Sequence, residues 1–321
     1  MNEFEVIREF FARQPVARPD VVLGIGDDAA LLGVPAGQEL VVSTDLLVSG
    51  VHFADDAEAE SIGHKALAVN LSDLAAMGAT PAWFTLNLSM PSVEVKWIEG
   101  FCRGLYALAG RYQVALVGGD TTRGPVTIGI QIMGFAPAGK ALRRSTAMAG
   151  DRIYVTGQIG DAALGLRLLQ GGLQIPEAFR ASVLARLHRP EPRVDAGLKI
   201  RDLATSCIDI SDGLAADLGH ILDASGVGAR LELERLPRSP AYASVFDVAG
   251  WEPALAGGDD YELCFTAPAA HERELVKIFA ALGLACTAVG EIEAQPGLRI
   301  FDKAGALYQP VKTGFDHFRR V

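Results

Sequence analysis

The sequence predicts an α/β protein of two domains, with mixed sheets, and three observations support this fold class. The chain has 321 residues, which is near the length at which single hydrophobic cores divide into separate domains. Half of the residues are hydrophobic and 21% are charged, a composition typical of an ordered globular chain. Short apolar runs with strand character alternate with helical segments rich in Ala and Leu.

The first half of the chain begins with an expected amphipathic helix at residues 3–13, whose apolar side chains fall on one side. The strands DVVLGIG and ELVVSTD follow, and each ends in Gly or Asp. A helix at 58–78 ends at Gly78 with Pro81 beyond it, a common C-terminal signal. The remaining elements are the strand AWFTLNLSM, the helix 94–112, and the strands QVALVGG and VTIGIQIMGF.

The domain junction is expected in the segment APAGKALRRSTAMAGD, around residues 137–150, because this segment has few large apolar residues. The expected domains are therefore residues 1–138 and 150–321. The second domain should contain, in order, the strand RIYVTG, helices at 161–170, 178–187 and 194–204, the strand SCIDI, a helix that ends near 224, a strand at 259–266, a helix at 270–283, and the strands CTAVG and LRIF.

Charge and composition argue against several classes of function. The formal net charge of −10 disfavours binding to nucleic acid or to an anionic membrane, because both require a basic surface. The four cysteines form no CxxC pair, so neither a zinc ribbon nor a redox dithiol is indicated. The start, MNEFEVIREFF, lacks the pattern of a signal peptide, and no apolar run reaches the length of a membrane span. We therefore expect a cytoplasmic protein.

Five acidic motifs fall at the ends of apolar strands or at helix starts, and a sixth acid lies inside an apolar helix. A glycine before Asp lets the backbone approach a ligand closely, and carboxylate oxygens suit Mg²⁺, which typically uses one or two carboxylates together with phosphate oxygens. The pattern therefore predicts that these acids bind metal ions, which in turn bind phosphate. The motifs are GIGDD with Asp27 and Asp28, STD with Asp45, NLSD with Asp73, GGD with Asp120, DISD with Asp209 and Asp212, and GGDD with Asp259 and Asp260.

A structural role is the alternative for each acid taken alone, since Asp after Gly is more often a turn residue or a helix N-cap. Asp27 fits a turn, Asp212 fits an N-cap before GLAADL, and Asp161 fits an N-cap outside any site. Repetition of the arrangement at apolar strands, where α/β sheets bind their ligands, favours a shared site. The sequence contains no GxxxxGK[ST], no HRD or DFG pair and no GxSxG, and GIGDDA lacks the third glycine of a dinucleotide fingerprint.

Taken in order, the motifs resemble those of the thiamine-monophosphate kinases, a family within the aminoimidazole-ribonucleotide-synthetase-like superfamily. The resemblance covers residues 24–318 and rests on GIGDDAALL, VVSTDLLVSGVHF, KALAVNLSDLAAMGATPAW, VGGDTTRGP, IDISDGL, GGDDYELCFT and GFDHF. It implies the two-domain fold of that superfamily. The N-terminal domain would bind ATP and metal and form a homodimer through its sheet, and the C-terminal domain would complete the ATP and substrate site. VTIGIQIMGF would suit an interface strand or an internal strand equally well.

The resemblance implies Mg²⁺-dependent transfer of the ATP γ-phosphate to thiamine monophosphate. Metal binding is implied for Asp28, Ser43, Thr44, Asp45, Asp73, Asp120, Asp209 and Asp212, ATP binding for Gly119, Asp120, Arg144 and Ser211, and substrate binding for His52, Asp259 and Phe315. The family usually has Glu where this chain has Asp259, and Phe315 lacks a hydroxyl, which limits it to stacking. Structural roles remain alternatives for Arg144 as a surface charge, His52 as a structural histidine and Phe315 as C-terminal packing.

The acceptor of the implied reaction is a phosphate oxygen, which is already anionic near neutral pH, so we expect direct in-line transfer without a strong general base. Two other functions are compatible with the motifs. One is another ATP-dependent member of the superfamily. The selenophosphate type would need a reactive Cys or selenocysteine near the N-terminus, where none precedes Cys102, and the hydrogenase-maturation type would need a C-terminal Cys, whereas this chain ends in HFRRV. The aminoimidazole ribonucleotide synthetase type is harder to exclude. The other is a catalytically silent metal–nucleotide sensor.

Overall fold

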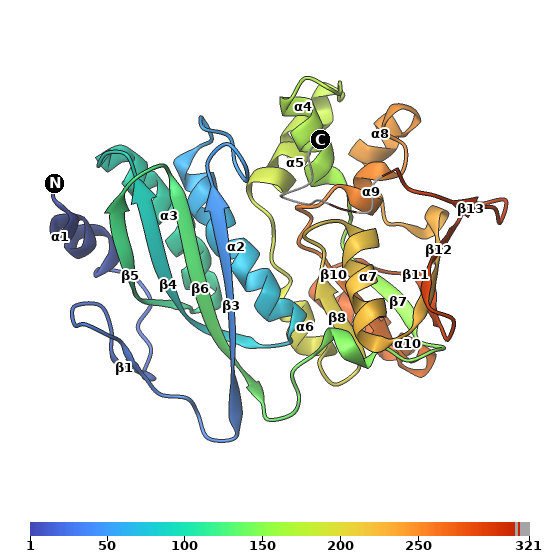
Figure 1. The fold of residues 1–321 in the computed structure, drawn as a ribbon, viewed down its shortest axis with the longest axis horizontal. Coiled ribbons are helices and arrows are strands. Elements are labelled where there is room, and N and C mark those ends of the chain that lie inside the picture. Colours follow the sequence, from blue (N-terminus) through green and yellow to red (C-terminus); the bar gives the residue numbers. More distant parts are fainter. Residues whose placement is uncertain (312–313, 315–321) are drawn as a thin grey trace. The chain divides into compact units, whose positions relative to one another are not determined.

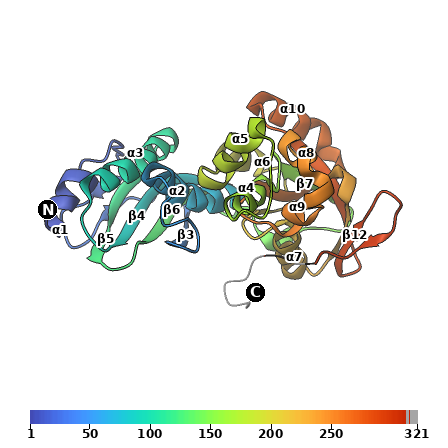
Figure 2. The same cartoon turned by 90° about the horizontal axis from the view of Figure 1, so that it is seen from above.

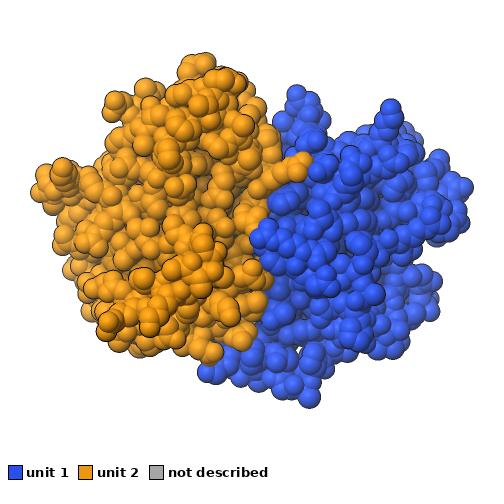
Figure 3. Space-filling model, turned by 180° about the vertical axis from the view of Figure 1, so that it is seen from behind, with its two compact units in different colours: residues 1–74, 79–141 blue, residues 75–78, 142–321 orange. Residues whose placement is uncertain are grey.

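The computed structural model describes residues 1–311 and 314, and the chain forms two compact units. Unit 1 comprises Met1–Leu74 and Ala79–Ala141, and unit 2 comprises Ala75–Gly78 and Leu142–Val321 (Figure 3). Each unit contains its own sheet, with four strands in unit 1 and seven in unit 2. The α/β fold class expected from the sequence is confirmed by these two mixed sheets.

Unit 1 is built on a sheet with the strand order β3-β6-β4-β5. β3 (Gln38–Val48) and β4 (Thr80–Met90) both pair antiparallel with β6 (Thr127–Pro137), and β4 pairs parallel with β5 (Ala115–Arg123). The helices α2 (Ala59–Ala76) and α3 (Val95–Tyr112) cover one face of this sheet (Figures 1 and 2). Because β6 has a neighbour on each side, VTIGIQIMGF is an internal strand and β3 is an edge strand.

The two helices of unit 1 approach each other at positions where only glycine fits. A Cβ atom at Gly63 of α2 would lie 2.0 Å from the carbonyl oxygen of Phe101, and one at Gly104 of α3 would lie 1.8 Å from that of Glu60. Both distances are far below van der Waals contact, so neither position accepts a side chain unless a helix moves. These glycines bring the backbones of α2 and α3 into direct contact and thereby fix where α2 lies on the sheet.

The N-terminal segment packs against the same sheet. It contains α1 (Glu3–Val6), a π-helical turn at Ile7–Phe11, and a short hairpin of β1 (Val21–Leu23) and β2 (Leu31–Leu32). Val16 joins Trp83, Ala115, Val117 and Phe135 in one buried cluster, and side chains of both hairpin strands pack against it. The loop between β1 and β2, which contains GIGDD, is therefore fixed beside β5.

Unit 2 is a sheet of order β13-β12-β9-β11-β7-β10-β8, in which every pairing is antiparallel except β12 with β9. Its elements are η2 (Arg144–Thr146), β7 (Arg152–Thr156), α4 (Asp161–Leu169), α5 (Glu177–His188), α6 (Val194–Ile200), β8 (Ser206–Asp209), α7 (Leu214–Ser225), β9 (Gly228–Glu232), η3 (Leu233–Arg235), α8 (Pro240–Ala249), α9 (Glu252–Ala256), β10 (Leu263–Ala267), η4 (Ala269–His271), α10 (Glu272–Leu282), β11 (Cys286–Glu293), β12 (Gly297–Phe301) and β13 (Leu307–Tyr308).

Both faces of the unit 2 sheet are covered, because neighbouring residues of a strand point to opposite faces. On one face, Ile153 and Val155 of β7 belong to a large core with α4, α5, α7, α8 and α9. On the other face, Tyr154 of β7 stacks on Phe265 at 5.2 Å, and Phe265 stacks on Phe279 of α10 at 6.0 Å. This double coverage explains why the central strands β7 and β10 are buried along almost their whole length.

Three sequence-based expectations were wrong in detail. β3 continues three residues past Asp45, and β5 continues three residues past Asp120, so these acids lie inside strands rather than at strand ends. The reason is that β3 pairs with β6 without interruption from Gln38 to Val48, and β5 pairs with β4 as far as Arg123. The strand expected at 259–266 starts only at Leu263, because Asp259 and Tyr261 have positive φ angles.

No helix within residues 1–311 and 314 combines the length and the apolar character needed to cross a membrane.

Candidate functional site

Three of the expected metal-binding residues meet where β3 packs against α2. Ser43 and Asp45 are two residues apart on β3 and therefore point to the same face of the strand. The hydroxyl of Ser43 donates a hydrogen bond of 2.5 Å to the Asp73 carboxylate of α2. Loss of water raises the pKa of Asp45 to about 7, and the negative charge of Asp73 contributes to this rise. Two carboxylates therefore lie close together at a partly buried site.

The chemistry of this site fits a hard divalent cation. All three side chains offer oxygen atoms, and a cation would relieve the repulsion and desolvation that raise the pKa of Asp45. One turn before Asp73, the Asn70 side chain is fully buried, and its Oδ1 has no hydrogen-bond partner in the part of the chain that the structure describes. Thr44 belongs to the opposite face of β3, where its hydroxyl donates to the carbonyl oxygen of Ile130 at 3.0 Å.

Among the described residues, no three His, Cys, Asp or Glu side chains are arranged so that they hold a metal ion by themselves.

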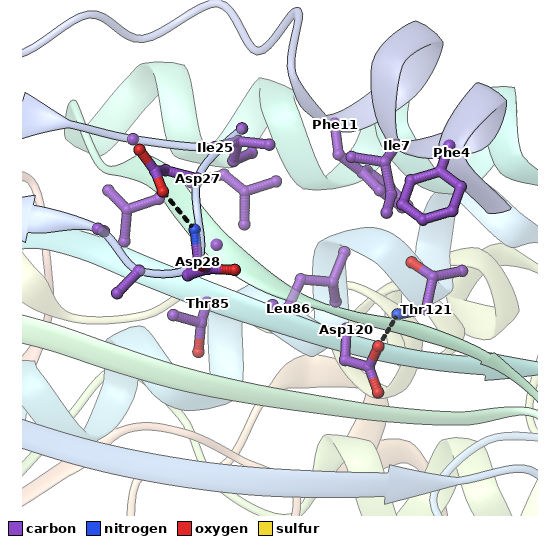
Figure 4. A pocket seen from close by; sticks show the side chains of 18 residues that line it. Phe4, Ile7, Phe11, Ile25, Asp27, Asp28, Thr85, Leu86, Asp120 and Thr121 are labelled. Atoms are coloured by element: carbon purple, nitrogen blue, oxygen red, sulfur yellow. Dashed lines mark hydrogen bonds between the residues drawn. The ribbon is translucent and has the colours of Figure 1, made fainter.

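A second group of expected site residues lines a cavity of about 630 Å³ in unit 1 (Figure 4). Asp28, Gly119 and Asp120 are among its lining residues, together with apolar side chains of the N-terminal helical turns. The volume is within the usual range of small-molecule sites. Gly119 has a φ of 142°, and a Cβ atom there would lie 1.9 Å from the carbonyl oxygen of Leu86, so glycine is required for β5 to approach β4.

Hydrogen bonds hold the acids around this cavity. Asp27 Oδ1 accepts the backbone N–H of Asp28 at 2.8 Å, which supports the view that Asp27 structures its own turn. Asp120 Oδ1 accepts the N–H of Thr121 at 2.9 Å. The cavity lies beside β5, whereas Ser43 and Asp45 belong to β3 at the opposite edge of the sheet. Unit 1 therefore presents the expected residues in two groups.

His52 lies in the turn that follows β3 and has a structural role there. Its Nδ1 accepts the N–H of Val48 at 3.0 Å, so any proton of the neutral ring must reside on Nε2. The buried Lys65 of α2 donates to the carbonyl oxygen of His52 at 3.1 Å. These bonds fix His52 at the end of β3.

In unit 2, the expected residues Asp209, Ser211 and Asp212 lie on the segment between β8 and α7, and a residue that the sequence analysis missed organises it. Asp217 of α7 is buried, and its Oδ2 accepts the backbone N–H groups of Ser211, Asp212 and Gly213 at 3.1 Å each. Burial raises the pKa of Asp217 to about 7, the nearby Asp212 adds to this, and the three N–H donors oppose it.

Two N-cap assignments from the sequence were wrong. Gly213, rather than Asp212, is the N-cap of α7, because Asp217 already satisfies the N–H groups of this turn. Gly160, rather than Asp161, is the N-cap of α4, and Asp161 is a buried first-turn residue that accepts the Ser239 hydroxyl at 2.6 Å. The sequence did contain a signal for Asp217, the residue that was missed. It is an acid inside an apolar helix, which is the same signal that identified Asp73.

The segment that contains Asp259 lies beside the segment that contains Ser211. The N–H of Asp259 donates to the carbonyl oxygen of Ser211, and the N–H of Tyr261 donates to that of Ile210, both at 2.8 Å. Arg144 lies in η2, where its carbonyl oxygen accepts the Ser225 hydroxyl at 2.8 Å and its side chain is exposed. Phe315, the remaining expected site residue, lies outside the described residues.

Comparisons with known proteins identify relatives over both halves of the chain. Residues 26–136 match the family model of AIR synthase related protein, N-terminal domain, and residues 148–303 match that of the C-terminal domain. The chain is 48% identical over 319 residues to thiamine-monophosphate kinase of Salmonella typhimurium, covering 99% of this chain and 98% of the relative.

Solved structures give the same result. The crystal structure of thiamine-monophosphate kinase from Stenotrophomonas maltophilia is 49% identical, covers 88% of this chain and 92% of that one, and superposes with a TM-score of 0.83. A structure described as AaThiL complexed with AMPPCP and TMP is 33% identical, covers 92% of each chain and has a TM-score of 0.78. Full-length identity to these proteins, together with both family models, shows that the chain belongs to the AIR synthase related proteins and, among them, to the thiamine-monophosphate kinase family.

Proposed function

We propose that this chain transfers the γ-phosphate of ATP to thiamine monophosphate and releases thiamine diphosphate and ADP. The observation that supports this most directly is the contact between β3 and α2, where Ser43, Asp45 and Asp73 form a partly buried group of oxygen ligands. The relative bound to AMPPCP, an analogue of ATP, and to TMP supports the same pair of substrates.

Magnesium is the cation that these residues suit, because it favours oxygen ligands and one or two carboxylates per ion. When bound, Mg²⁺ would supply positive charge that offsets the charge of the phosphate groups. Ser43, Asp45 and Asp73 would hold it from the side of β3 and α2, and Thr44, whose hydroxyl is bonded to Ile130, would contribute through its backbone. The other proposed ligands are Asp28 and Asp120 beside the unit 1 cavity, and Asp209 and Asp212 in unit 2.

ATP would bind through two sets of residues. In unit 1, the 630 Å³ cavity offers apolar side chains and the backbone at Gly119 and Asp120. In unit 2, Ser211 belongs to a segment whose backbone is held by Asp217, and Arg144 provides a guanidinium that can grip two phosphate oxygens. Fixed donors of this kind lower the cost of arranging a polyphosphate for reaction.

The acceptor would be bound by His52, by the Asp259 carboxylate, and by stacking on Phe315. Its attacking oxygen belongs to a phosphate group and is anionic near neutral pH, so no residue has to remove a proton from it. We therefore propose direct in-line transfer. Labelled phosphoprotein recovered after incubation with γ-labelled ATP would contradict direct transfer.

A coupled assay of ADP release tests the proposed function. We expect ADP to form only when ATP, Mg²⁺ and thiamine monophosphate are all present, and chelation of the metal to stop its formation. ADP release without an acceptor requirement, or none at all, would contradict the kinase assignment, and the second outcome would favour a silent nucleotide sensor. An acceptor panel that includes the aminoimidazole ribonucleotide synthetase substrate would separate the superfamily alternatives.

We propose that the chain forms a homodimer, because one face of β3 exposes a row of apolar side chains. Leu40, Val42 and Leu46 alternate along this edge strand and are 45%, 47% and 59% exposed. Apolar side chains in a row on an edge strand are typical of an interaction surface, because a monomer gains nothing by exposing them. A second copy that covered this face would bury the row.

A further inference from the structure

The loop Gly258–Tyr261 has an unusual backbone. Gly258, Asp259 and Tyr261 have φ angles of 71°, 61° and 50°. Among the described residues, only three other than glycine have positive φ, and two of them are in this loop. Asp tolerates this region moderately well, whereas a bulky residue such as Tyr rarely adopts it because its Cβ atom crowds the backbone.

The surrounding structure holds the loop in this conformation. Asp259 and Tyr261 donate their N–H groups to the segment that precedes α7, as described above. Between them, the buried Asp260 carboxylate accepts the N–H of Gly160 through both oxygens, at 2.9 and 2.8 Å, and so ties the loop to the start of α4. A Cβ atom at Gly258 would lie 2.7 Å from the carbonyl oxygen of Ser211, so this approach also requires glycine.

One consequence of this backbone is a contact between side chains two residues apart. The Tyr261 hydroxyl donates a hydrogen bond of 3.1 Å to Asp259 Oδ1. In an extended strand these residues would stand side by side along one face, but the positive φ angles turn the phenol so that its hydroxyl meets the acid. The positive φ angles and the hydrogen bond between these two side chains thus occur in the same short loop.

We propose that Tyr261 is a positioning residue for acceptor binding: its hydroxyl fixes the Asp259 carboxylate in the direction that contacts thiamine monophosphate. This inference rests on the proposed function. Thiamine monophosphate contains a permanently cationic thiazolium ring and an amino group, and a fixed carboxylate complements both. Asp259 is one methylene shorter than Glu, and the backbone of the loop and the Tyr261 bond both contribute to where its oxygens lie.

The test is Tyr261→Phe, which keeps the ring and its φ preference and removes only the hydroxyl. We expect the KM for thiamine monophosphate to rise about tenfold, the value for one hydrogen bond to a charged group, while the KM for ATP and the melting temperature stay unchanged. Tyr154→Phe is the matched control, because it removes a tyrosine hydroxyl from a buried position on β7 of the same unit. It should leave both KM values unchanged.

A double-mutant cycle separates positioning from a general effect on the loop. In the Asp259→Ala background, Tyr261→Phe should have no further effect on the KM for thiamine monophosphate, because the group that it orients is gone. Calorimetric titration with thiamine monophosphate gives the same comparison as dissociation constants if turnover becomes too slow to measure.

The outcomes distinguish this inference from the proposed function. If the wild-type chain releases ADP in response to the acceptor but Tyr261→Phe leaves the acceptor KM unchanged, only the inference fails. It also fails if Tyr261→Phe raises the KM tenfold in the Asp259→Ala background, or raises the KM for ATP equally. If the wild-type chain neither binds thiamine monophosphate nor responds to it, the proposed function fails and the inference fails with it.

Discussion

Replacement of Asp45 by Asn should stabilise the metal-free chain while it abolishes Mg²⁺-dependent turnover. The pKa of Asp45 rises from 3.8 to about 7, chiefly through burial and further through the charge of Asp73. A carboxyl group with a raised pKa in the folded chain keeps its proton there at pH values where the unfolded chain has already lost it. The free energy of unfolding therefore falls as the pH rises from about 4 through about 7. Because a tenfold change in a proton-binding constant corresponds to about 1.4 kcal/mol, this rise in pKa lowers the free energy of unfolding by at most about 4 kcal/mol near pH 8.

Asn resembles the protonated acid and avoids this cost. Urea unfolding in the presence of a chelator should show the variant more stable than the wild type by up to about 4 kcal/mol near pH 8, and by less than half of that near pH 5. Added Mg²⁺ should stabilise the wild type near pH 8 and leave the variant unaffected. Asp56→Asn, which changes an exposed acid in the loop after β3, is the control and should alter stability little.

Two results would refute this reasoning: a variant that is less stable than the wild type near pH 8, or a gain of the same size at both pH values. The first would mean that the Asp45 carboxylate is stabilised by the fold. The second would mean that the gain does not come from ionisation.

Three further predictions concern the surroundings of the proposed site. Asp217→Ala should destabilise unit 2 by about 3 kcal/mol in urea unfolding and speed hydrogen exchange at the three amides that Asp217 binds. Asp217→Asn retains an acceptor oxygen and should lose less stability. Equal exchange rates in the two variants would contradict this account. Gly104→Ala should lower the free energy of unfolding by about 1–3 kcal/mol through the clash with α2. Gly110→Ala, where a Cβ atom meets no neighbouring atom, should raise it by up to about 1 kcal/mol. Similar effects of the two substitutions in urea unfolding would show that the helices are free to separate. Leu46→Lys should convert a dimer to a monomer in light scattering, and Val95→Lys, at a similarly exposed apolar position on α3, should not; a dimer that persists in Leu46→Lys would place the interface elsewhere.

The sequence predicted the class of the fold and most of its long elements, because apolar periodicity and Gly or Pro signals are local properties. Strand ends were less predictable. The polar residues at STD and GGD suggested that strands stop there, but pairing with β6 and β4 extends both strands beyond the acids. A polar residue inside a strand looks like an end whenever its partner strand is unknown.

The site was predictable in its residue types and only partly in its arrangement. Asp73 was noticed because a carboxylate in an apolar helix face is costly, and the same argument applied to Asp217. Asp217 was missed because GLAADLGH reads as an ordinary helix, and only the structure shows its oxygen facing three N–H groups. Likewise, no pattern in GGDDYEL predicts the positive φ angles of Asp259 and Tyr261 or the hydrogen bond between their side chains.

The contact between α2 and α3 has a consequence for variation in this chain. Gly63 and Asp73 belong to the same helix, about 15 Å apart along its axis, so a methyl group that pushes α2 away from α3 would also shift Asp73 relative to Ser43. A random-mutagenesis screen for lost activity should therefore recover substitutions at 63 and 104 whose phenotype mimics that of a ligand substitution. Second-site suppressors should then appear on the facing helix rather than among the carboxylates.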